Sequence, residues 1–156
     1  MRIAIRNTVR LRTAIGLTTS LLAMAAAHAQ APGAKSGLLA ACPDRNNCVS
    51  SDAINPKHAI APFRLKMPPA EAWGELKRLI EATPDTRIVQ ATPDYLSVEF
   101  TTGRLRFIDD VEFLLRAQQR EVAVRSASRF GYYDFGVNRE RVEQLRATLR
   151  EKGVVE

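Results

Sequence analysis

The sequence contains few of the side chains that most often bind metals or carry out redox chemistry. Its 156 residues include two cysteines and two histidines. Cys42 and Cys48 are separated by five residues rather than the two of a redox-active pair, which argues against a thiol oxidoreductase. A zinc site would need two ligands beyond this pair, and His58 is the one histidine outside the first 29 residues. We therefore predict neither a metal site nor a cofactor.

The sequence also lacks an apolar run long enough to cross a membrane. Its longest run, from Thr13 to Ala27, holds about 15 residues and includes several Thr and Ser, whereas a spanning helix needs about 20 apolar residues. Four arginines and no acid precede this run, and the small residues Ala27 and Ala29 follow it. This pattern predicts a signal peptide over residues 1–29, cleaved before Gln30, with an uncleaved anchor as the alternative. We expect an exported protein, periplasmic or secreted.

Net positive charge is mostly a property of the signal peptide. The whole chain carries 23 Lys plus Arg against 17 Asp plus Glu, a formal charge of +6. Removal of the four arginines at the N-terminus leaves +2, with the two signs mixed. Because no long basic stripe remains to follow a phosphate backbone, nucleic-acid binding is not expected. A composition of 46% hydrophobic and 26% charged residues is typical of a globular protein.

The two cysteines are predicted to form a disulfide, because an exported protein folds in an oxidising compartment. The loop closed between Cys42 and Cys48 would stabilise the fold by about 2 kcal/mol through loss of unfolded-chain entropy. Lipidation is the alternative, since residues 39–42 match the pattern at which lipoproteins are cleaved and acylated on cysteine. Polar residues 30–37 separate this pattern from the apolar run, which favours the disulfide.

The mature chain is predicted to form a short leader and one domain. Residues 30–37 are small and polar without periodicity, which indicates a disordered leader. A single globular domain is expected over residues 38–152, followed by a tail of residues 153–156. Within the domain, residues 42–62 are rich in Pro, Asn, Ser and Asp, which predicts a loop region pinned by the disulfide.

Two amphipathic helices are predicted. Pro68 and Pro69 open the first, where a missing backbone N–H costs nothing, and apolar residues then recur at helical spacing until Pro84 ends it. The second helix is predicted to begin with Asn138 as its N-cap and to end near Gly153.

Alternating apolar and polar residues predict the strands between the two helices. We expect strands over residues 88–91 and 95–101, another after residue 104, and a fourth over residues 121–128, with a short edge strand near residues 63–67. The predicted fold is therefore α+β, an antiparallel sheet of about four strands packed against two helices, with a disulfide-pinned N-terminal loop region.

A two-residue turn at Thr102-Gly103 is expected to join two of these strands. Counting from this turn places Leu96 opposite Asp109, and puts Asp109 on the same face as the apolar Phe107 and Val111. A carboxylate buried there without a partner would cost several kcal/mol. A cation or several N–H donors must therefore approach it.

The required partner is predicted to come from the arginine-rich C-terminal third of the chain. We expect a polar network that joins Asp109 or Asp110 to one or more arginines, which fixes the strands and the last helix or forms part of a site. The candidate arginines are Arg125, Arg129, Arg139 and Arg141.

An alternative hypothesis makes the carboxylates of Asp109, Asp110 and Glu112 an enzymatic or metal-dependent site, together with Arg125 or Arg129. In a regular strand the first of these carboxylates points away from the other two. The three would converge only across a β-bulge.

The segment from Phe130 to Gly136 holds four aromatic residues and two glycines. Its rings could line a binding cleft together with nearby arginines, or they could plug one end of the sheet. The candidate binding residues of this part of the chain are Arg125, Arg129, Tyr132, Tyr133, Asp134, Asn138 and Arg139.

Several segments together carry a family resemblance. They are Cys42-Pro43 with Asn47-Cys48-Val49-Ser50-Ser51, Asp94-Tyr95-Leu96 with Glu99-Phe100, Phe107 with Asp109-Asp110-Val111-Glu112-Phe113, and Arg125-Ser126-Ala127-Ser128-Arg129 with Gly136-Val137-Asn138-Arg139 and Arg141-Val142-Glu143. With these, the region from Cys42 to Leu149 resembles the bacterial domain-of-unknown-function family 1499. Asn46 departs from the proline expected before Asn47. The resemblance implies an exported or membrane-associated domain and implies no activity, cofactor or catalytic residue.

The expected function is that of a small binding or scaffolding module of the bacterial envelope, with the aromatic and arginine-rich loop as its contact surface. Its partner would be an envelope protein or a small ligand, the protein a monomer, and no membrane span is expected after signal cleavage. An envelope enzyme that uses the carboxylates described above is the alternative.

Overall fold

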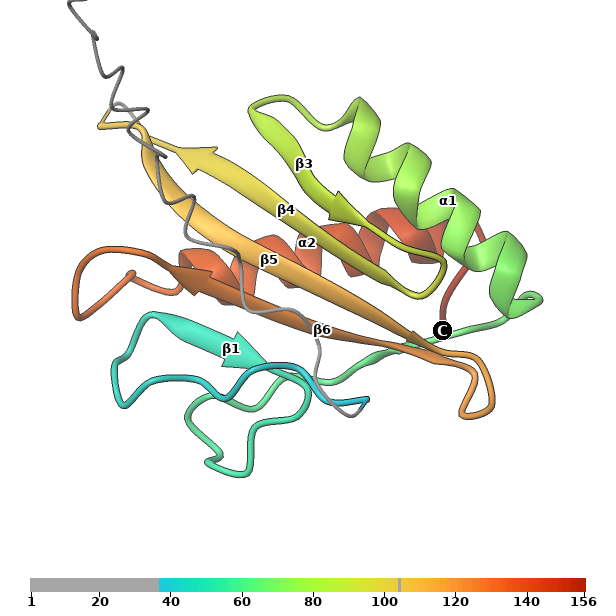
Figure 1. The fold of residues 1–156 in the computed structure, drawn as a ribbon, viewed down its shortest axis with the longest axis horizontal. Coiled ribbons are helices and arrows are strands. Elements are labelled where there is room, and N and C mark those ends of the chain that lie inside the picture. The colour runs from blue at the N-terminus through green and yellow to red at the C-terminus, as the bar shows by residue number, and fades with distance from the viewer. Residues whose placement is uncertain (1–36, 104) are drawn as a thin grey trace, which may run out of the picture.

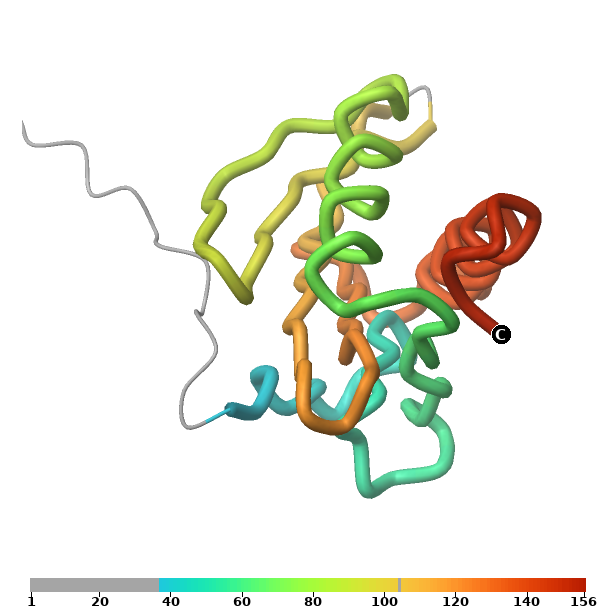
Figure 2. The backbone as a smooth tube through the Cα atoms, turned by 90° about the vertical axis from the view of Figure 1, so that its right-hand side faces the viewer, coloured from blue at the N-terminus to red at the C-terminus, as the bar shows by residue number. Residues whose placement is uncertain are grey.

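The structure, a computed structural model, describes residues 37–103 and 105–156; the expected signal peptide and the leader through residue 36 lie outside this part. One antiparallel sheet forms one layer, and two helices on the same side of it form the other (Figures 1 and 2). In chain order the elements are β1 Cys48–Ser50, β2 Phe63–Arg64, α1 Pro69–Ala82, β3 Thr86–Ala91, β4 Tyr95–Thr102, β5 Phe107–Arg116, β6 Glu121–Ser128 and α2 Val137–Glu151. The predicted α+β class is confirmed.

The sheet has the strand order β1-β6-β5-β4-β3, and β2 also pairs with β6. The four predicted strands form its body, β3 to β6. Strand β1 was not predicted, because its three residues lie in a segment rich in turn-forming residues and show no alternation. Both short strands lie along the same outer side of β6, where Cys48 is paired with Ala127 and Phe63 with Val122.

The hairpin between β4 and β5 differs from its predicted form. Thr102 pairs with Phe107, so residues 103–106 form a four-residue loop and the predicted two-residue turn is wrong. The longer loop shifts the register by four residues and places Leu96 opposite Phe113 instead of Asp109. This pairing is favoured because both apolar side chains are then fully buried. An even shift leaves every side chain on its predicted face, so the aspartate still points toward the helices.

The main core lies between the sheet and the helices. Helix α1 contributes Ala72, Trp73, Leu76 and Ile80, the stripe that the sequence predicts. The other principal members come from α2 and from the helix-facing residues of β4, β5 and β6: Leu96, Val98, Val111, Phe113, Val122, Val124, Val142, Leu145 and Leu149.

Helix α2 does not begin as the sequence suggests. Its N-cap is Gly136, in the left-handed conformation with φ +84°, and Asn138 lies inside the first turn. The carboxylate of Asp134 caps the helix instead, because it accepts hydrogen bonds from the backbone N–H groups of Gly136 and Asn138, both at 3.0 Å. The predicted N-cap is therefore wrong, and the side chain of Asn138 is available to the interior.

The last four residues belong to the domain and do not form the expected tail. Val154 and Val155 are each 1% exposed, so they form part of the core. The backbone N–H of Lys66 donates to the carbonyl of Val154 at 3.0 Å, and that of Glu156 donates to the carbonyl of Arg64 at 3.0 Å. Two consecutive valines give no helical or strand period, which is why their burial was missed.

A disulfide joins Cys42 to Cys48, as predicted, and fixes the loop that precedes β1. Because the Sγ atom of Cys42 is bonded in this way, it has no free thiol for lipidation. Within residues 37–103 and 105–156, neither helix has the length and apolar character needed to cross a bilayer.

Candidate binding surface

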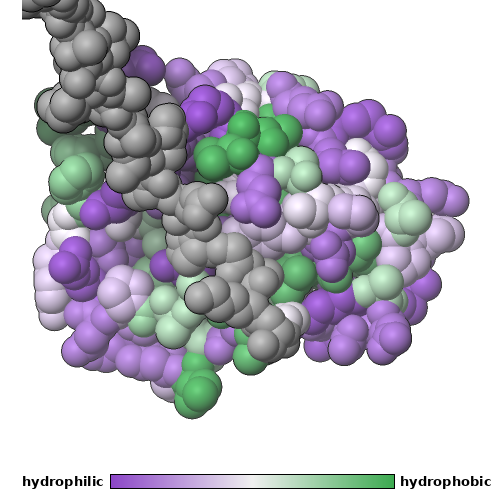
Figure 3. Space-filling model, viewed as in Figure 1, coloured by the Kyte–Doolittle hydropathy of each residue, from purple (hydrophilic) through white to green (hydrophobic). Residues whose placement is uncertain are grey.

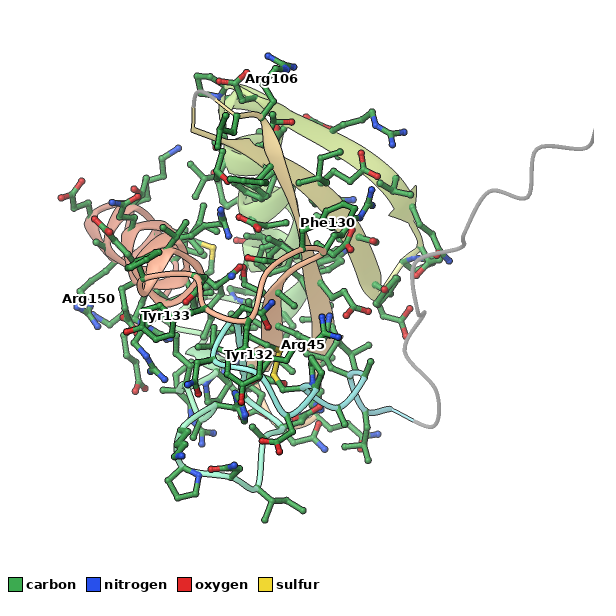
Figure 4. The ribbon with its side chains drawn as sticks, turned by 90° about the vertical axis from the view of Figure 1, so that its left-hand side faces the viewer. Arg45, Arg106, Phe130, Tyr132, Tyr133 and Arg150 are labelled. Carbon is green, nitrogen blue, oxygen red and sulfur yellow. A yellow bond between two sulfur atoms is a disulfide. The ribbon has the colours of Figure 1, made fainter. Side chains whose placement is uncertain are left out.

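The aromatic segment between β6 and α2 lies at the end of the sheet where the β4–β5 loop also lies (Figures 1 and 4). All four of its rings are exposed, from 57% for Tyr133 to 87% for Phe135. The rings of these two residues contact each other edge to face, with centroids 5.0 Å apart. The rings therefore do not plug the end of the sheet, and the expectation that they line a binding cleft stays a prediction.

The β4–β5 loop extends this apolar area. Leu105 is 77% exposed and Phe107 51%, and Val137 at the start of α2 is also exposed. Seven of the ten large apolar side chains that are exposed in the described residues lie on these two neighbouring segments. We call them the aromatic surface: Leu105, Phe107, Phe130, Tyr132, Tyr133, Phe135 and Val137. A contiguous exposed apolar area of this kind marks an interaction site more often than a chance distribution does.

A groove of about 400 Å³ runs between the two segments. Thr102, Gly103 and Phe107 line one side, and the aromatic segment lines the other. Its lining is mainly apolar, with the carboxylate of Asp109 and the hydroxyl of Ser128 among the few polar groups. A groove of this size and character fits an apolar group of modest dimensions.

A second, more polar hollow of about 220 Å³ adjoins the groove. Tyr133 and Asp134 line both, so the aromatic segment forms the wall between them. Lys57 and Arg139 bring two cations to this hollow. His58 also lines it but is 94% buried, and its Nδ1 lies 2.9 Å from the backbone oxygen of Cys48.

Asn138 holds the base of the aromatic segment. Its side chain is fully buried, and its Nδ2 donates to the backbone oxygen of Asn47, the hydroxyl of Ser128 and the carboxylate of Asp134, at 2.8 to 3.1 Å. The amide of Asn47 in turn donates to the carbonyl of Gly131 at 2.7 Å. These bonds tie the loop before β1, the end of β6 and the start of α2 together, so the exposed rings stand on a fixed backbone.

Asp109 has the arginine partner that its burial requires. Its Oδ2 lies 2.5 Å from Nη2 of Arg141, and both side chains are buried. The same guanidinium donates to Ser126 and Asn138 at 3.0 and 2.8 Å and lies 5.0 Å from the ring centre of Phe100. The predicted network between an aspartate and the last helix is confirmed, and it lies directly beneath the groove.

The other face of the sheet, turned toward the viewer in Figure 1, bears a separate set of ion pairs. Arg129 donates to both carboxylate oxygens of Asp110 at 2.9 and 2.7 Å and also to Glu99, which accepts a further bond from Arg87. Hydrogen bonding to Asp110 and Glu99 raises the pKa of the Arg129 guanidinium. Burial opposes ionisation of Glu99, but the two arginines outweigh it, so the pKa of Glu99 lies below its usual value.

Glu112 lies next along this face in a buried triad. Its carboxylate accepts a bond from the Tyr95 hydroxyl at 2.7 Å and pairs with Arg125 at 2.9 Å. Burial raises the pKa of Glu112 despite these two partners, and burial together with the carboxylate raises the pKa of Tyr95. Outside the atoms drawn in grey, hydrophilic residues predominate on this face (Figure 3).

The candidate binding residues thus separate into two groups. Tyr132, Tyr133, Asp134 and Arg139 belong to the aromatic surface or to the hollows beside it. The others are engaged inside the fold or on the opposite face of the sheet: Arg125, Arg129 and Asn138.

Three members of the aromatic surface were missed from the sequence: Leu105, Phe107 and Val137. The alternation that assigned Phe107 to the apolar face was correct. The alternation could not show that β5 extends past the helices at the end of the sheet near Phe107, where the helix-facing side is uncovered. The run of four rings in seven residues is the one sequence signal of the site.

The three carboxylates of the alternative hypothesis do not converge. Asp109 points toward the helices, whereas Asp110 and Glu112 lie on the opposite face, and no β-bulge interrupts β5 at this point. Each of them pairs with a different arginine. Among the described residues there is no group of three or more potential ligands able to hold a metal ion.

A family model described as a protein of unknown function, DUF1499, matches residues 38–149. The chain belongs to the DUF1499 family. The match confirms the resemblance drawn from the sequence segments, and it includes both loops of the aromatic surface and all but the end of α2. No curated protein and no solved structure matches this DUF1499 chain.

Proposed function

We propose that this DUF1499 domain is a binding module of the cell envelope that holds an apolar partner at the aromatic surface. The observation that supports the proposal is the gathering of seven large apolar side chains on two neighbouring segments, around a groove of about 400 Å³. Rings that stay exposed bury little apolar area when the domain folds. A partner that covers them removes their apolar area from water, which is favourable.

The backbone beneath these rings is prepared for binding. Asp134 caps α2, Asn138 joins three segments, and Asn47 holds the carbonyl of Gly131. A surface already fixed in this way loses little further conformational freedom when a partner binds. The same hydrogen bonds stabilise the fold and lower the entropic cost of binding at the exposed apolar surface.

A location in the envelope belongs to the same proposal. It is supported by the signal-peptide pattern of residues 1–29 and by the disulfide between Cys42 and Cys48, a bond typical of oxidising compartments. The mass of the protein purified from the exported fraction tests it. We expect the mass of residues 30–156 less two hydrogens, and the mass of the uncleaved chain would contradict the proposal.

Binding at the aromatic surface is tested with the uncharged dye Nile red, whose fluorescence rises in apolar surroundings. The double variant Phe130→Ser/Phe135→Ser removes both phenylalanines of the aromatic segment, which are its two most exposed rings. We expect dye fluorescence to fall several-fold while the melting temperature stays within about 2 °C, since exposed side chains contribute within about 0.5 kcal/mol.

The matched control is Ile54→Ser, because Ile54 is fully exposed but is not part of the aromatic surface. It should leave dye binding unchanged. If the double variant binds the dye as well as the wild type does, the apolar surface of the domain lies elsewhere and the proposal fails.

A further inference from the structure

We infer that the partner of the aromatic surface is the surface of a lipid bilayer that contains anionic headgroups. This inference rests on the proposed binding function and specifies the chemistry of the partner. Three observations support it: how far the rings are exposed, which charges surround them, and how the loops are held.

The exposure of the rings favours a fluid apolar medium over a single enclosed ligand. Phe135 and Phe130 are 87% and 74% exposed, so most of each ring lies outside the groove. A small ligand in the groove would leave these outer ring faces in water. The interfacial region of a bilayer can surround them from all sides, while Tyr132 and Tyr133 place hydroxyl groups at the level of the polar headgroups.

Unpaired cations surround the rings. Arg45 precedes Asn46, whose backbone forms an isolated β-bridge with that of Tyr133. Figure 4 shows Arg45 near Tyr132. Arg106 lies in the β4–β5 loop between two members of the aromatic surface. Lys57 and Arg139 line the polar hollow next to Tyr133. In the described part of the chain, none of these four cations takes part in an ion pair: Arg45, Lys57, Arg106 and Arg139.

Other described cations also lack an ion pair, namely Lys66, Lys77, Arg120, Arg150 and Lys152, so what sets this end of the domain apart is that its four unpaired cations lie beside exposed rings. Eight other arginines are paired with carboxylates, and several of these lie on the sheet face that lacks helices, among them Arg87, Arg125 and Arg129. The two buried or half-buried acids near the rings are already engaged, because Asp109 pairs with Arg141 and Asp134 caps α2. The segments that carry the four unpaired cations also carry two exposed carboxylates, Asp44 and Glu140, so positive charge is in excess there. Arginine binds phosphate oxygens in the same bidentate way as carboxylates, so this charge pattern complements anionic headgroups.

Two segments present the rings and the cations together. Hydrogen bonds from Asn47 and Asn138 hold the aromatic segment at its base, and on the other side of the groove Thr102 is paired with Phe107 at the ends of β4 and β5. The exposed apolar side chains of these segments are available for insertion. Two shallow loops suit peripheral docking, in which binding strength grows with the apolar area inserted and with the charge attracted to the surface.

Flotation with lipid vesicles tests the inference. Purified protein with its disulfide intact is mixed with vesicles of phosphatidylcholine alone or with 30% phosphatidylglycerol, at low and high salt. We expect binding to the mixed vesicles at low salt, and weaker binding to pure phosphatidylcholine or at high salt. Phe130→Ser/Phe135→Ser should reduce binding more than tenfold. Arg45→Gln/Arg106→Gln should reduce it by about fivefold for each arginine removed.

Two controls match these variants. Ile54→Ser removes an exposed apolar side chain outside the aromatic surface, and Arg150→Gln removes an exposed arginine at the far end of α2. Both should bind vesicles as the wild type does. Insertion itself is read from Phe135→Trp, whose emission should shift to shorter wavelength when the mixed vesicles are added. Binding without this shift, or binding that survives loss of the two phenylalanines, would overturn the inference.

Failure of this inference can be distinguished from failure of the proposed function. If Nile red binds at the aromatic surface but vesicles do not, the proposed binding of an apolar partner stands and the lipid inference is wrong. A dimer in sedimentation experiments that Phe130→Ser/Phe135→Ser dissociates, without vesicle binding, would assign the surface to a second copy of the chain. If neither dye nor vesicles bind, both proposals fail.

Discussion

Replacement of Arg141 by Met should destabilise the domain more than any surface substitution on the same helix. The substitution keeps most of the side-chain length but removes the guanidinium that pairs with Asp109 and bonds Ser126 and Asn138. The carboxylate of Asp109, 2% exposed, would then keep only the Thr102 hydroxyl at 3.3 Å. Its desolvation would no longer be compensated.

The magnitude follows from the cost of leaving one member of a buried ion pair without its partner. That cost is about 3–5 kcal/mol in the free energy of unfolding. Loss of the contact between Arg141 and the ring of Phe100 adds to it. For a domain of this size, the expected fall in melting temperature is about 10–20 °C.

Thermal and urea unfolding of the two proteins measure the difference. Arg139→Met is the matched control, since Arg139 is exposed on the same helix and donates one hydrogen bond, to the carbonyl of Lys57 at 3.3 Å. It should change stability by less than about 0.5 kcal/mol. Addition of Asp109→Asn to Arg141→Met should recover about 1–2 kcal/mol, because the stranded charge is removed. Equal stabilities of the Arg141 and Arg139 variants would refute this account of the network.

Three further predictions concern other parts of the fold. Cys42→Ser/Cys48→Ser should lower the free energy of unfolding by about 2 kcal/mol, measured by urea denaturation, and an unchanged midpoint would contradict the entropic argument. Because the folded-state pKa of Glu99 lies below its usual 4.5, its contribution to stability is present above that pH and is lost as the pH falls through the lowered pKa. The slope of stability against pH in this acidic range should therefore be smaller in Glu99→Gln. Val154→Ala/Val155→Ala should lower the melting temperature by about 10 °C or more, because both side chains are buried in the core; a tail would show no change.

Features that depend on local patterns could be predicted from the sequence. Strand β6 has the bounds that its alternation indicated, Glu121–Ser128, and the buried stripe of α1 is the predicted one. The pairing of Asp109 with an arginine could also be predicted, because the cost of a buried carboxylate does not depend on the details of the fold. Which arginine would reach it depended on how α2 crosses the sheet.

Features decided by distant parts of the chain could not be predicted. Thr102-Gly103 fits a two-residue turn well, but the pairing of Leu96 with Phe113 across the whole hairpin outweighs the local preference. Strand β1 and Val155 have no periodicity of their own and are ordered by segments far away in the sequence. The exposure of the aromatic surface is of the same kind, because apolar side chains are usually buried and their position beyond the ends of the helices is a tertiary property.

The pairing of β1 and β2 with β6 has a consequence for the order in which the chain can fold. The strands from β3 to β6 can pair with their neighbours early in folding, since each is joined to the next by a short connection. Strands β1 and β2 pair only with β6, and the backbone of Lys66 bonds to Val154, so these contacts close much longer loops. Closure over such long loops is slow compared with hairpin formation. The fold is therefore completed by contacts between its two ends, and a chain that lacks β6 leaves both β1 and β2 without their partner strand.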